Sequence, residues 1–494
     1  MKIKSWLLLT IIILFAISLR LINFGSNPVS LYWDEVAIGL DVQSILETGK
    51  DINNNHPLQP LFKSYGDYKA PIYILITTFF AKFFGVTEKI IRLPSLLSFA
   101  GLCLSLFFLL KLIFPSKKLI PWISLITLSL LPWSYHFSRI GMESHLSLFF
   151  LTSSIYFLIK SLKEKKLLLT SLSSLTLSLG IYSYIVLRII GPILFFLAFL
   201  LYKTKSQKFN KKSFLISTVI ITVSIFILTS SSFYKESQNY RLSNNNLLTS
   251  TTHIESSVQS KLTTTNTIID RAVFHRYYYK AKEYLSNYLE YFSPQFLFLT
   301  GDPNQRHHSG YGGELLLVQG IFLAIGLFSL LKTTPKPKLL ILFWLFLSPS
   351  IAALVNETPH ASRSIYQMIP LVIIISLGIN QFFEMKSIRK LTPPLIILVT
   401  LINFSLYLYD YHHYYPSRSS LSWIQPYSSV FKHFSQNKTQ KQVYLTPDYY
   451  QPELYARFYL EDYDNFSFTL PELCPQEAIC ISKDNWQTIT KNPL

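Results

Sequence analysis

The stretch Leu31-Tyr32-Trp33-Asp34-Glu35-Val36-Ala37-Ile38-Gly39 follows shortly after the first long apolar run, Trp6 to Phe24. That run matches the length of about 20 residues that crosses a bilayer, so Asp34 and Glu35 are expected at a membrane surface. A carboxylate in this position can accept a proton from a hydroxyl nucleophile or hold a divalent cation. The structural alternative is a helix start, with Asp34 as the cap and Glu35 in the first turn.

The composition indicates a polytopic membrane protein. Half of the 494 residues are hydrophobic, and the chain contains 38 Phe and 31 Tyr. The net charge of +18 does not indicate nucleic-acid binding, because Lys and Arg occur in short clusters between apolar runs and form no continuous basic face. We therefore expect the lipid bilayer as a partner and exclude nucleic acid.

Six basic clusters serve as cytoplasmic markers, since short loops rich in Lys and Arg stay in the cytoplasm. They are Lys2 and Lys4; Lys111, Lys117 and Lys118; Lys160, Lys163, Lys165 and Lys166; Lys203, Lys205, Lys208, Lys211 and Lys212; Lys332, Lys336 and Lys338; and Lys386, Arg389 and Lys390. This placement puts the N-terminus in the cytoplasm. The loops between the markers, and the C-terminus, then lie outside.

Eleven apolar runs alternate between the two sides. They are 5–24, 93–113, 119–138, 145–162, 167–187, 189–202, 213–233, 312–331, 339–355, 365–384 and 391–409. A further run, 70–84, is too short for comfortable spanning and carries Lys82, so we expect a juxtamembrane amphipathic helix. The prediction is an all-α polytopic membrane protein of about eleven transmembrane helices.

The predicted membrane domain comprises residues 1–411, with long outer loops at 25–92 and 234–311, and residues 412–494 form a separate extracytoplasmic domain. In this C-terminal domain Gln442 to Leu445 and Phe466 to Thr469 are expected as strands, and Pro452 to Leu460 as a helix, which predicts a small α/β fold. A disulfide between Cys474 and Cys480 depends on the domain being outside the cytoplasm, and it stays open.

A second polar cluster runs from His136 to His145, between the third and fourth predicted spans. Arg139 and Glu143 are four residues apart, so on a helix they would share a face and form an ordinary ion pair. The alternative is that Arg139 contacts a phosphate, while Glu143 joins Asp34 around a metal or an acceptor.

Cations recur at the predicted outer ends of the spans: Lys69, Arg92, Arg188, Arg306 and Arg363. Together they suit a lipid-linked phosphate, because ammonium and guanidinium groups stabilise charge that develops on a departing phosphate. Each one taken singly could instead contact lipid headgroups. Nearby Tyr184, His307 and His360 are further candidates for the same cavity. His307 and the adjacent His308 could bind metal, although neighbouring side chains point apart.

The ordered motifs resemble the polyprenyl-phosphate-sugar-dependent glycosyltransferases of the C-type membrane fold (glycosyltransferase family 39), which include protein O-mannosyltransferases and the aminoarabinose transferases of lipid A. The matching stretches are Trp33 to Gly39; Gly66-Asp67-Tyr68-Lys69-Ala70-Pro71; Arg92-Leu93-Pro94-Ser95; His136 to Arg139 with Glu143; Tyr182-Ser183-Tyr184 with Arg188; Arg306 to Gly313; and Thr358-Pro359-His360-Ala361-Ser362-Arg363. The resemblance covers roughly residues 1–385.

This resemblance implies transfer of one sugar, with inversion, from a polyprenyl-phosphate donor to an acceptor hydroxyl on the extracytoplasmic side. It implies Asp34 as the general base and places Glu143 where many relatives have an acidic residue. Together with Glu35, the acid next to Asp34, these are the predicted catalytic residues. Lys69, Arg92, Arg139 and Arg363 would bind the donor phosphate. A divalent metal at Asp34 and Glu143 is an option and not a requirement, because Lys and Arg can supply the positive charge.

Two other functions are compatible with a membrane protein of this kind. A ligase that moves a whole glycan from its lipid carrier would need a longer and wider outer groove. A flippase or transporter of lipid-linked sugars would need charged residues inside the spans and would not need Asp34. The sugar and the acceptor, whether protein, lipid or polysaccharide, are not identified by the sequence.

Overall fold

The computed structural model describes residues 3–65, 67–243, 252–263, 267–355, 357–384, 392–469 and 471–491. Within these residues, seven helices are long and apolar enough to cross a membrane, and shorter apolar helices occupy the other four predicted spans. The helices of the bundle are α1 (Ile3–Leu21), α4 (Glu88–Ile113), α5 (Ile120–Ser129), α6 (Pro132–Phe137), α7 (Glu143–Glu164), α8 (Leu167–Ile181), α9 (Leu187–Tyr202), α10 (Gln207–Ser230), α15 (Gln319–Leu331), α16 (Pro335–Leu347), α17 (Met368–Glu384) and α18 (Thr392–His413).

Some predicted spans differ in detail from the observed helices. The run 119–138 is divided into α5 and α6, because Pro132 lacks a backbone N–H and begins a new helix instead of extending α5. The eighth span begins at Gln319 instead of residue 312, and the fifth ends at Ile181. The residues freed at these ends form turns, and the turn that follows Ile181 lines the pocket described below.

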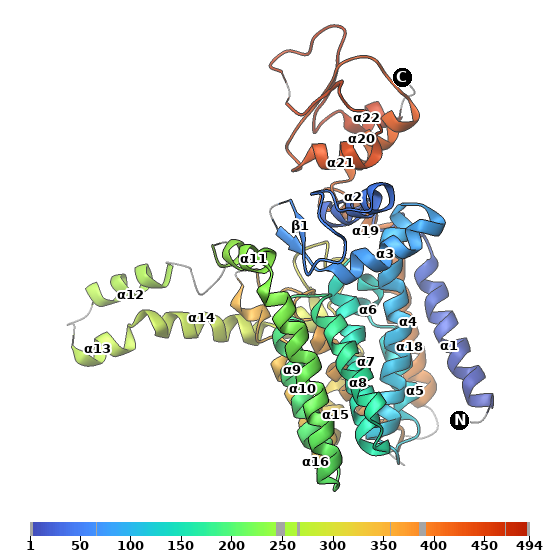
Figure 1. The fold of residues 1–494 in the computed structure, drawn as a ribbon, viewed down its shortest axis with the longest axis vertical. Coiled ribbons are helices and arrows are strands. Elements are labelled where there is room, and N and C mark those ends of the chain that lie inside the picture. Colours follow the sequence, from blue (N-terminus) through green and yellow to red (C-terminus); the bar gives the residue numbers. More distant parts are fainter. Residues whose placement is uncertain are drawn as a thin grey trace.

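The end of the bundle that carries the N-terminus, here called the N-terminal end (Figure 1), holds the basic clusters of the described residues. Ser5 lies with Lys111, Lys117 and Lys118 around one hollow, and Lys163 donates to the carbonyl of Leu112. The ammonium of Lys336 lies 5.8 Å from the ring of Tyr202, at the end of α9. The N-terminal cluster and four of the predicted marker loops therefore share one end, five of the six clusters in all. The cluster at 386–390 lies outside the described residues.

The opposite end, here called the pocket end, carries the first long loop (Figure 1). This loop contains α2 (Trp33–Thr48), the antiparallel strands β1 (Phe62–Ser64) and β2 (Asp67–Lys69), and α3 (Pro71–Phe84). α3 lies across the end of the bundle, buries Tyr73, Ile74 and Thr77, and exposes Phe79, Phe83 and Phe84. It is the short amphipathic helix that the sequence predicts for residues 70–84.

The second long segment projects sideways near the pocket end as an arm (Figure 1). It consists of α11 (Ser232–Ser243), α12 (Thr252–Leu262), α13 (Ile268–Val273) and α14 (Arg276–Glu290), and the π-helical turn Gln295–Leu299 returns the chain to the bundle. Tyr284 and Tyr288 of α14 donate to the carbonyls of Ser350 and Phe346, which anchors the base of the arm. Two 3-10 turns, Ala352–Leu354 and Ile365–Gln367, flank the loop that follows α16.

The C-terminal residues fold above the pocket end (Figure 1). They form α19 (Tyr415–Arg418), α20 (Gln425–Gln436), β3 (Val443–Leu445), α21 (Pro452–Tyr459), β4 (Phe466–Ser467), β5 (Ile479–Ile481) and α22 (Trp486–Lys491). The strands make a parallel sheet in the order β4-β3-β5, and Cys474 is disulfide-bonded to Cys480. The two predicted strands and the predicted helix are present, while β5 was not predicted. Tyr455 donates to the carbonyl of Leu31, so this domain contacts the segment that leads into α2.

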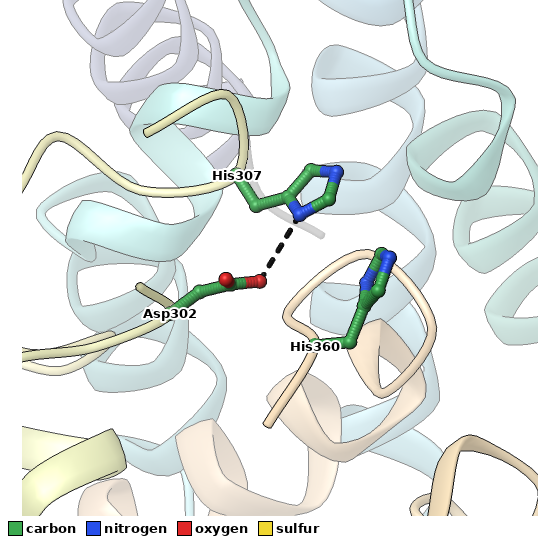
Figure 2. Close-up of side chains that lie close together, drawn as sticks. All are labelled: Asp302, His307 and His360. Carbon is green, nitrogen blue, oxygen red and sulfur yellow. Dashed lines mark hydrogen bonds and ion pairs between the residues drawn. The ribbon is translucent and has the colours of Figure 1, made fainter. Parts of the chain in front are cut away.

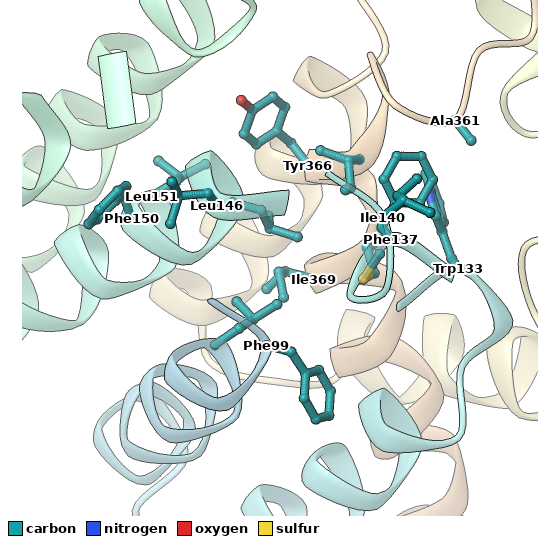
Figure 3. Close-up of a cluster of buried hydrophobic side chains, with 14 of the residues drawn as sticks. Phe99, Trp133, Phe137, Ile140, Leu146, Phe150, Leu151, Ala361, Tyr366 and Ile369 are labelled. Atoms are coloured by element: carbon teal, nitrogen blue, oxygen red, sulfur yellow. The ribbon is translucent and has the colours of Figure 1, made fainter. Parts of the chain in front are cut away.

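A continuous apolar core lies beneath the pocket end (Figure 3). Phe99 of α4, Trp133 and Phe137 of α6, and Ile369 of α17 are each 0% exposed. Because such side chains interdigitate with few voids, they fix the ends of the helices from which the pocket is built.

Candidate active site

A pocket opens at the pocket end, where several helices begin. Asp34 lies in the first turn of α2, Glu143 is the first residue of α7, and Arg188 lies in the first turn of α9. Helix N-termini carry unpaired backbone N–H groups and a partial positive charge, which favours bound anions and stabilises carboxylates. The backbone of the fold therefore makes this pocket suitable for a phosphate.

Nine of the twelve candidates from the sequence line this pocket. They are Asp34, Lys69, Glu143, Tyr184, Arg188, Arg306, His307, His360 and Arg363. They come from segments that are far apart in the chain, so only the folded structure brings them together. Asp67 and Ser362, which lie within the matching stretches but were not predicted as site residues, also line the pocket, and so does Met142.

Asp34 and Lys69, which both line the pocket, form an ion pair. Lys69 ends strand β2, where pairing with Phe62 fixes its backbone, and its side chain is 7% exposed, whereas that of Asp34 is 46% exposed. Burial raises the pKa of Asp34, but attraction to Lys69 and their hydrogen bond outweigh this effect, so the pKa is lowered from its ordinary value. Asp34 is thus ionised at neutral pH and accessible to a molecule that enters from outside.

Lys69 also faces Glu143. Burial lowers the pKa of Lys69, but attraction to Asp34 and Glu143 outweighs burial and raises it, so the ammonium stays charged. The positive charge of Lys69 is attracted to both carboxylates, so it already neutralises part of the negative charge that a metal at Asp34 and Glu143 would need. A metal at Asp34 and Glu143 stays a prediction from the sequence.

Three arginines complete the positive side of the pocket. The guanidinium of Arg306 stacks 3.9 Å from the ring centroid of Tyr32, next to the start of α2. Nη1 of Arg363 is buried and has no hydrogen-bond partner within the described part of the chain. Arg188 donates from Nε to the carbonyl of Ile181. A buried N–H without a partner is costly, so Arg363 is poised for an anionic ligand.

Glu35 and Arg92 do not reach the pocket, which corrects their predicted roles. Arg92 donates to both carboxylate oxygens of Glu35, at 2.9 and 3.0 Å, and the two side chains are 0% and 3% exposed. Glu35 also accepts from the backbone N–H groups of Tyr32 and Gly141. With its remaining donors bound to backbone carbonyls of residues 25, 28 and 30, Arg92 has none left for a phosphate. The pair instead joins α2, α4 and the loop before α7.

Arg139 is also turned away from the pocket, contrary to prediction. It is 0% exposed and donates to the backbone carbonyls of Arg20, Asn23 and Asn27. The alternative of a helical pair with Glu143 is wrong as well, because α6 ends at Phe137 and α7 begins at Glu143, with no helix between them. Arg139 therefore holds the segment that leads from α1 towards α2.

Asp302, His307 and His360 form a buried group at one wall of the pocket (Figure 2). Nδ1 of His307 lies 3.1 Å from Oδ2 of Asp302, and the same oxygen accepts from the backbone N–H of Ala361 at 2.7 Å. The ring centroids of His307 and His360 are 4.2 Å apart. His308 points elsewhere, with its Nδ1 accepting from the N–H of Gly310, so the adjacent histidines do not act as a pair.

A family model described as dolichyl-phosphate-mannose-protein mannosyltransferase matches residues 68–231, about a third of the chain. No curated protein sequence matches. Among solved structures, ArnT from Cupriavidus metallidurans bound to undecaprenyl phosphate aligns with a TM-score of 0.55 and 10% identity, covering 99% of this chain and 88% of ArnT. The archaeal oligosaccharyltransferase AglB from Archaeoglobus fulgidus, in complex with an inhibitory peptide and a dolichol-phosphate, aligns with a TM-score of 0.52 and 12% identity.

The alignment with AglB covers 92% of this chain but only 64% of AglB, so the chain spans less than two thirds of that enzyme. At such low identities the structural likeness concerns the fold. The helical bundle, the candidate spans and the two aligned membrane enzymes agree with the fold that the sequence motifs imply. The chain is therefore a multi-pass membrane protein whose fold is similar to that of ArnT and of AglB.

Proposed function

We propose that this protein is a glycosyltransferase that moves a single sugar from a polyprenyl-phosphate donor to an acceptor hydroxyl, with inversion at the anomeric carbon. The observation that carries the proposal is the pair of Asp34 and Lys69 inside a pocket that also contains Arg188, Arg306 and Arg363. A base that is open to solvent thus stands next to a cluster of cations suited to a phosphate.

The donor enters with its phosphate against the cations. A polyprenyl-phosphate sugar is a phosphodiester with one negative charge, while the departing lipid phosphate carries more charge as the bond to the anomeric carbon breaks. Fixed cations therefore bind the leaving group in the transition state more strongly than they bind the donor, which is the requirement for catalysis. Lys69 takes part in this binding, and the phosphate competes with Asp34 for its ammonium.

Asp34 accepts the proton of the acceptor hydroxyl as the oxygen attacks the anomeric carbon. The electron pair of the broken C–O bond leaves with the lipid phosphate, and no covalent intermediate with the enzyme is needed. When the donor is bound, its phosphate draws the Lys69 ammonium away from Asp34. The carboxylate of Asp34 then becomes more basic. Glu143 faces the same ammonium and helps to orient it.

The pocket end faces the extracytoplasmic side in this proposal, and the N-terminal end faces the cytoplasm. Support comes from the basic loops that gather at the N-terminal end, because short basic loops are retained in the cytoplasm. The disulfide of the C-terminal domain is consistent with an oxidising compartment. Residues 412–494 then form an extracytoplasmic domain above the pocket, and the membrane domain comprises residues 1–411.

The test is sugar transfer in reconstituted vesicles with synthetic polyprenyl-phosphate sugars, offered with peptide, lipid and oligosaccharide acceptors. Asp34→Asn should lower the turnover rate by about 10²–10⁴-fold, the usual contribution of a general base, while donor binding is retained. Asp464→Asn, which alters an exposed acid of the C-terminal domain, is the matched control and should transfer normally. Full activity of folded Asp34→Asn, or movement of the donor across the bilayer without transfer, would refute the proposal.

A further inference from the structure

The group formed by Asp302, His307 and His360 has the composition and spacing of a metal site (Figure 2). One ligand atom from each residue lies within 4.8 Å of the other two, and all three residues are buried. Asp302 and His307 lie in the loop that precedes α15, whereas His360 lies in the loop that precedes α17. The two loops are tied together where Asp302 accepts from the N–H of Ala361.

One carboxylate and two imidazoles form a donor set typical of catalytic zinc sites, in which a fourth position stays open. Zn–N and Zn–O bonds of about 2.0–2.1 Å place tetrahedral ligand atoms about 3.3 Å apart. Nδ1 of His307 and Oδ2 of Asp302 are already 3.1 Å apart. Because the largest separation in the group is below 4.8 Å, closure around an ion needs movements of about 1.5 Å or less.

His307 and His360 also line the pocket, whereas Asp302 lies behind them. A cation held by all three residues would therefore present its remaining coordination position to the pocket. Arg306 and Arg363 line the same wall, and their positive charge opposes a dication when the pocket holds no anion. A phosphate oxygen removes this conflict because it neutralises the arginines and fills the open position.

We infer that Asp302, His307 and His360 bind one divalent cation of the zinc class, with a coordination position that is open to the pocket. The site itself is inferred from the donor atoms and the spacing of these three residues. The assignment of a donor-phosphate oxygen to the open position rests on the proposed function. The cation would add to the charge that Lys69 and the arginines supply to the leaving phosphate.

Direct metal binding tests the site. The detergent-purified full chain is stripped with a chelator and titrated with Co²⁺, whose visible absorption reports nitrogen ligands and coordination number, and bound metal is counted by mass spectrometry. We expect one Co²⁺ to bind per chain, and we expect Zn²⁺ to displace it. Asp302→Asn, His307→Gln and His360→Gln should each weaken binding by more than about tenfold, since even residues that only support a metal ligand contribute that much.

His56→Gln and His275→Gln remove exposed histidines and are the controls for adventitious binding, so both should keep the affinity of the wild type. Zn²⁺ should raise the Tm of the wild type and of these controls, and not that of the three site variants. Failure of the wild type to bind Co²⁺, or equal binding by all three site variants, would overturn the site. If a variant misfolds, the Tm and the Co²⁺ spectrum of the wild type still show whether the protein binds the metal.

The open position is tested by adding polyprenyl phosphate to the Co²⁺-loaded protein. A change in the Co²⁺ absorption supports coordination by the phosphate. An unchanged spectrum, when the lipid is shown to bind, refutes it. Metal binding is measured without sugar transfer, so failure of the proposed activity and failure of this site give different results.

Discussion

Arg92→Gln separates a structural role for Arg92 from the phosphate-binding role that its sequence position implies. In the wild type, Arg92 makes two bonds to Glu35 and one each to the backbone carbonyls of Gly25, Pro28 and Ser30. Glutamine cannot replace this set, so the change leaves a carboxylate that is 2% exposed without its counter-ion. We therefore expect a large loss of stability.

Breaking a buried ion pair by removing one partner costs about 3–5 kcal/mol. A loss of about 4 kcal/mol lowers the folding equilibrium constant by roughly a thousandfold, at about 1.4 kcal/mol per factor of ten. Lys438→Gln is the control, because it removes a cation from the pair with Glu461, in which both side chains are more than 80% exposed. An exposed pair of this kind contributes about 1 kcal/mol or less.

The assay measures the Tm in detergent together with the affinity for polyprenyl phosphate at a temperature where the variant is folded. A structural role predicts a strongly lowered Tm and donor affinity close to that of the wild type. The double variant Glu35→Gln/Arg92→Gln should lose less than the sum of the single variants, because neither charge is then left unpaired. An unchanged Tm with weakened donor binding would refute the reasoning and restore Arg92 as a phosphate ligand.

Three further outcomes are expected. Lys69→Gln should weaken polyprenyl-phosphate binding by about 30-fold or more, equivalent to at least about 2 kcal/mol for a buried charge pair, whereas Lys438→Gln should leave it unchanged in calorimetric titration. His308 is 2% exposed and burial lowers its pKa to about 4, so the unfolded chain binds a proton between about pH 6.5 and 4 that the folded chain does not. Stability should therefore fall by up to about 3 kcal/mol as pH drops through this window, and a melting profile of His308→Asn with the same slope would contradict this cause. Cys474→Ser opens a short loop closed by the bond to Cys480, so it should lower the stability of the C-terminal domain by about 2 kcal/mol without changing donor affinity, as proteolysis and binding assays can show.

The helical, membrane-spanning character of the chain could be predicted from the sequence, although only seven of the described helices are long and apolar enough to cross a membrane. Apolar length and the positions of the basic loops are local properties, and each helix satisfies its own backbone hydrogen bonds in lipid. The short helix α3 was recognised for the same reason, because its length and Lys82 are visible in the sequence. Boundaries at Pro132 and Gln319 were missed because chain turns within apolar runs do not alter hydrophobicity.

The pocket was predicted in part. Asp34, Lys69 and Arg363 could be proposed from motifs, but the motifs alone do not distinguish a cation that lines a pocket from one that holds the fold. Arg92 and Arg139 occur in similar polar stretches, yet both guanidinium groups are bound to backbone carbonyls inside the protein. The positions of those carbonyls depend on packing between segments that are distant in sequence, and no local pattern reports them.

The sequence by itself determined a polytopic helical membrane protein with a polar site at one end, because hydrophobicity, charge and helix length act over short stretches of chain. Only the tertiary structure decided which polar residues share that site. In the folded chain Asp34 pairs with Lys69, whereas Glu35 is buried and pairs with Arg92. Asp302 lies next to His307 and His360. Ion pairing and metal coordination require contact within a few ångströms, and such contacts between distant residues exist only once the helices have packed.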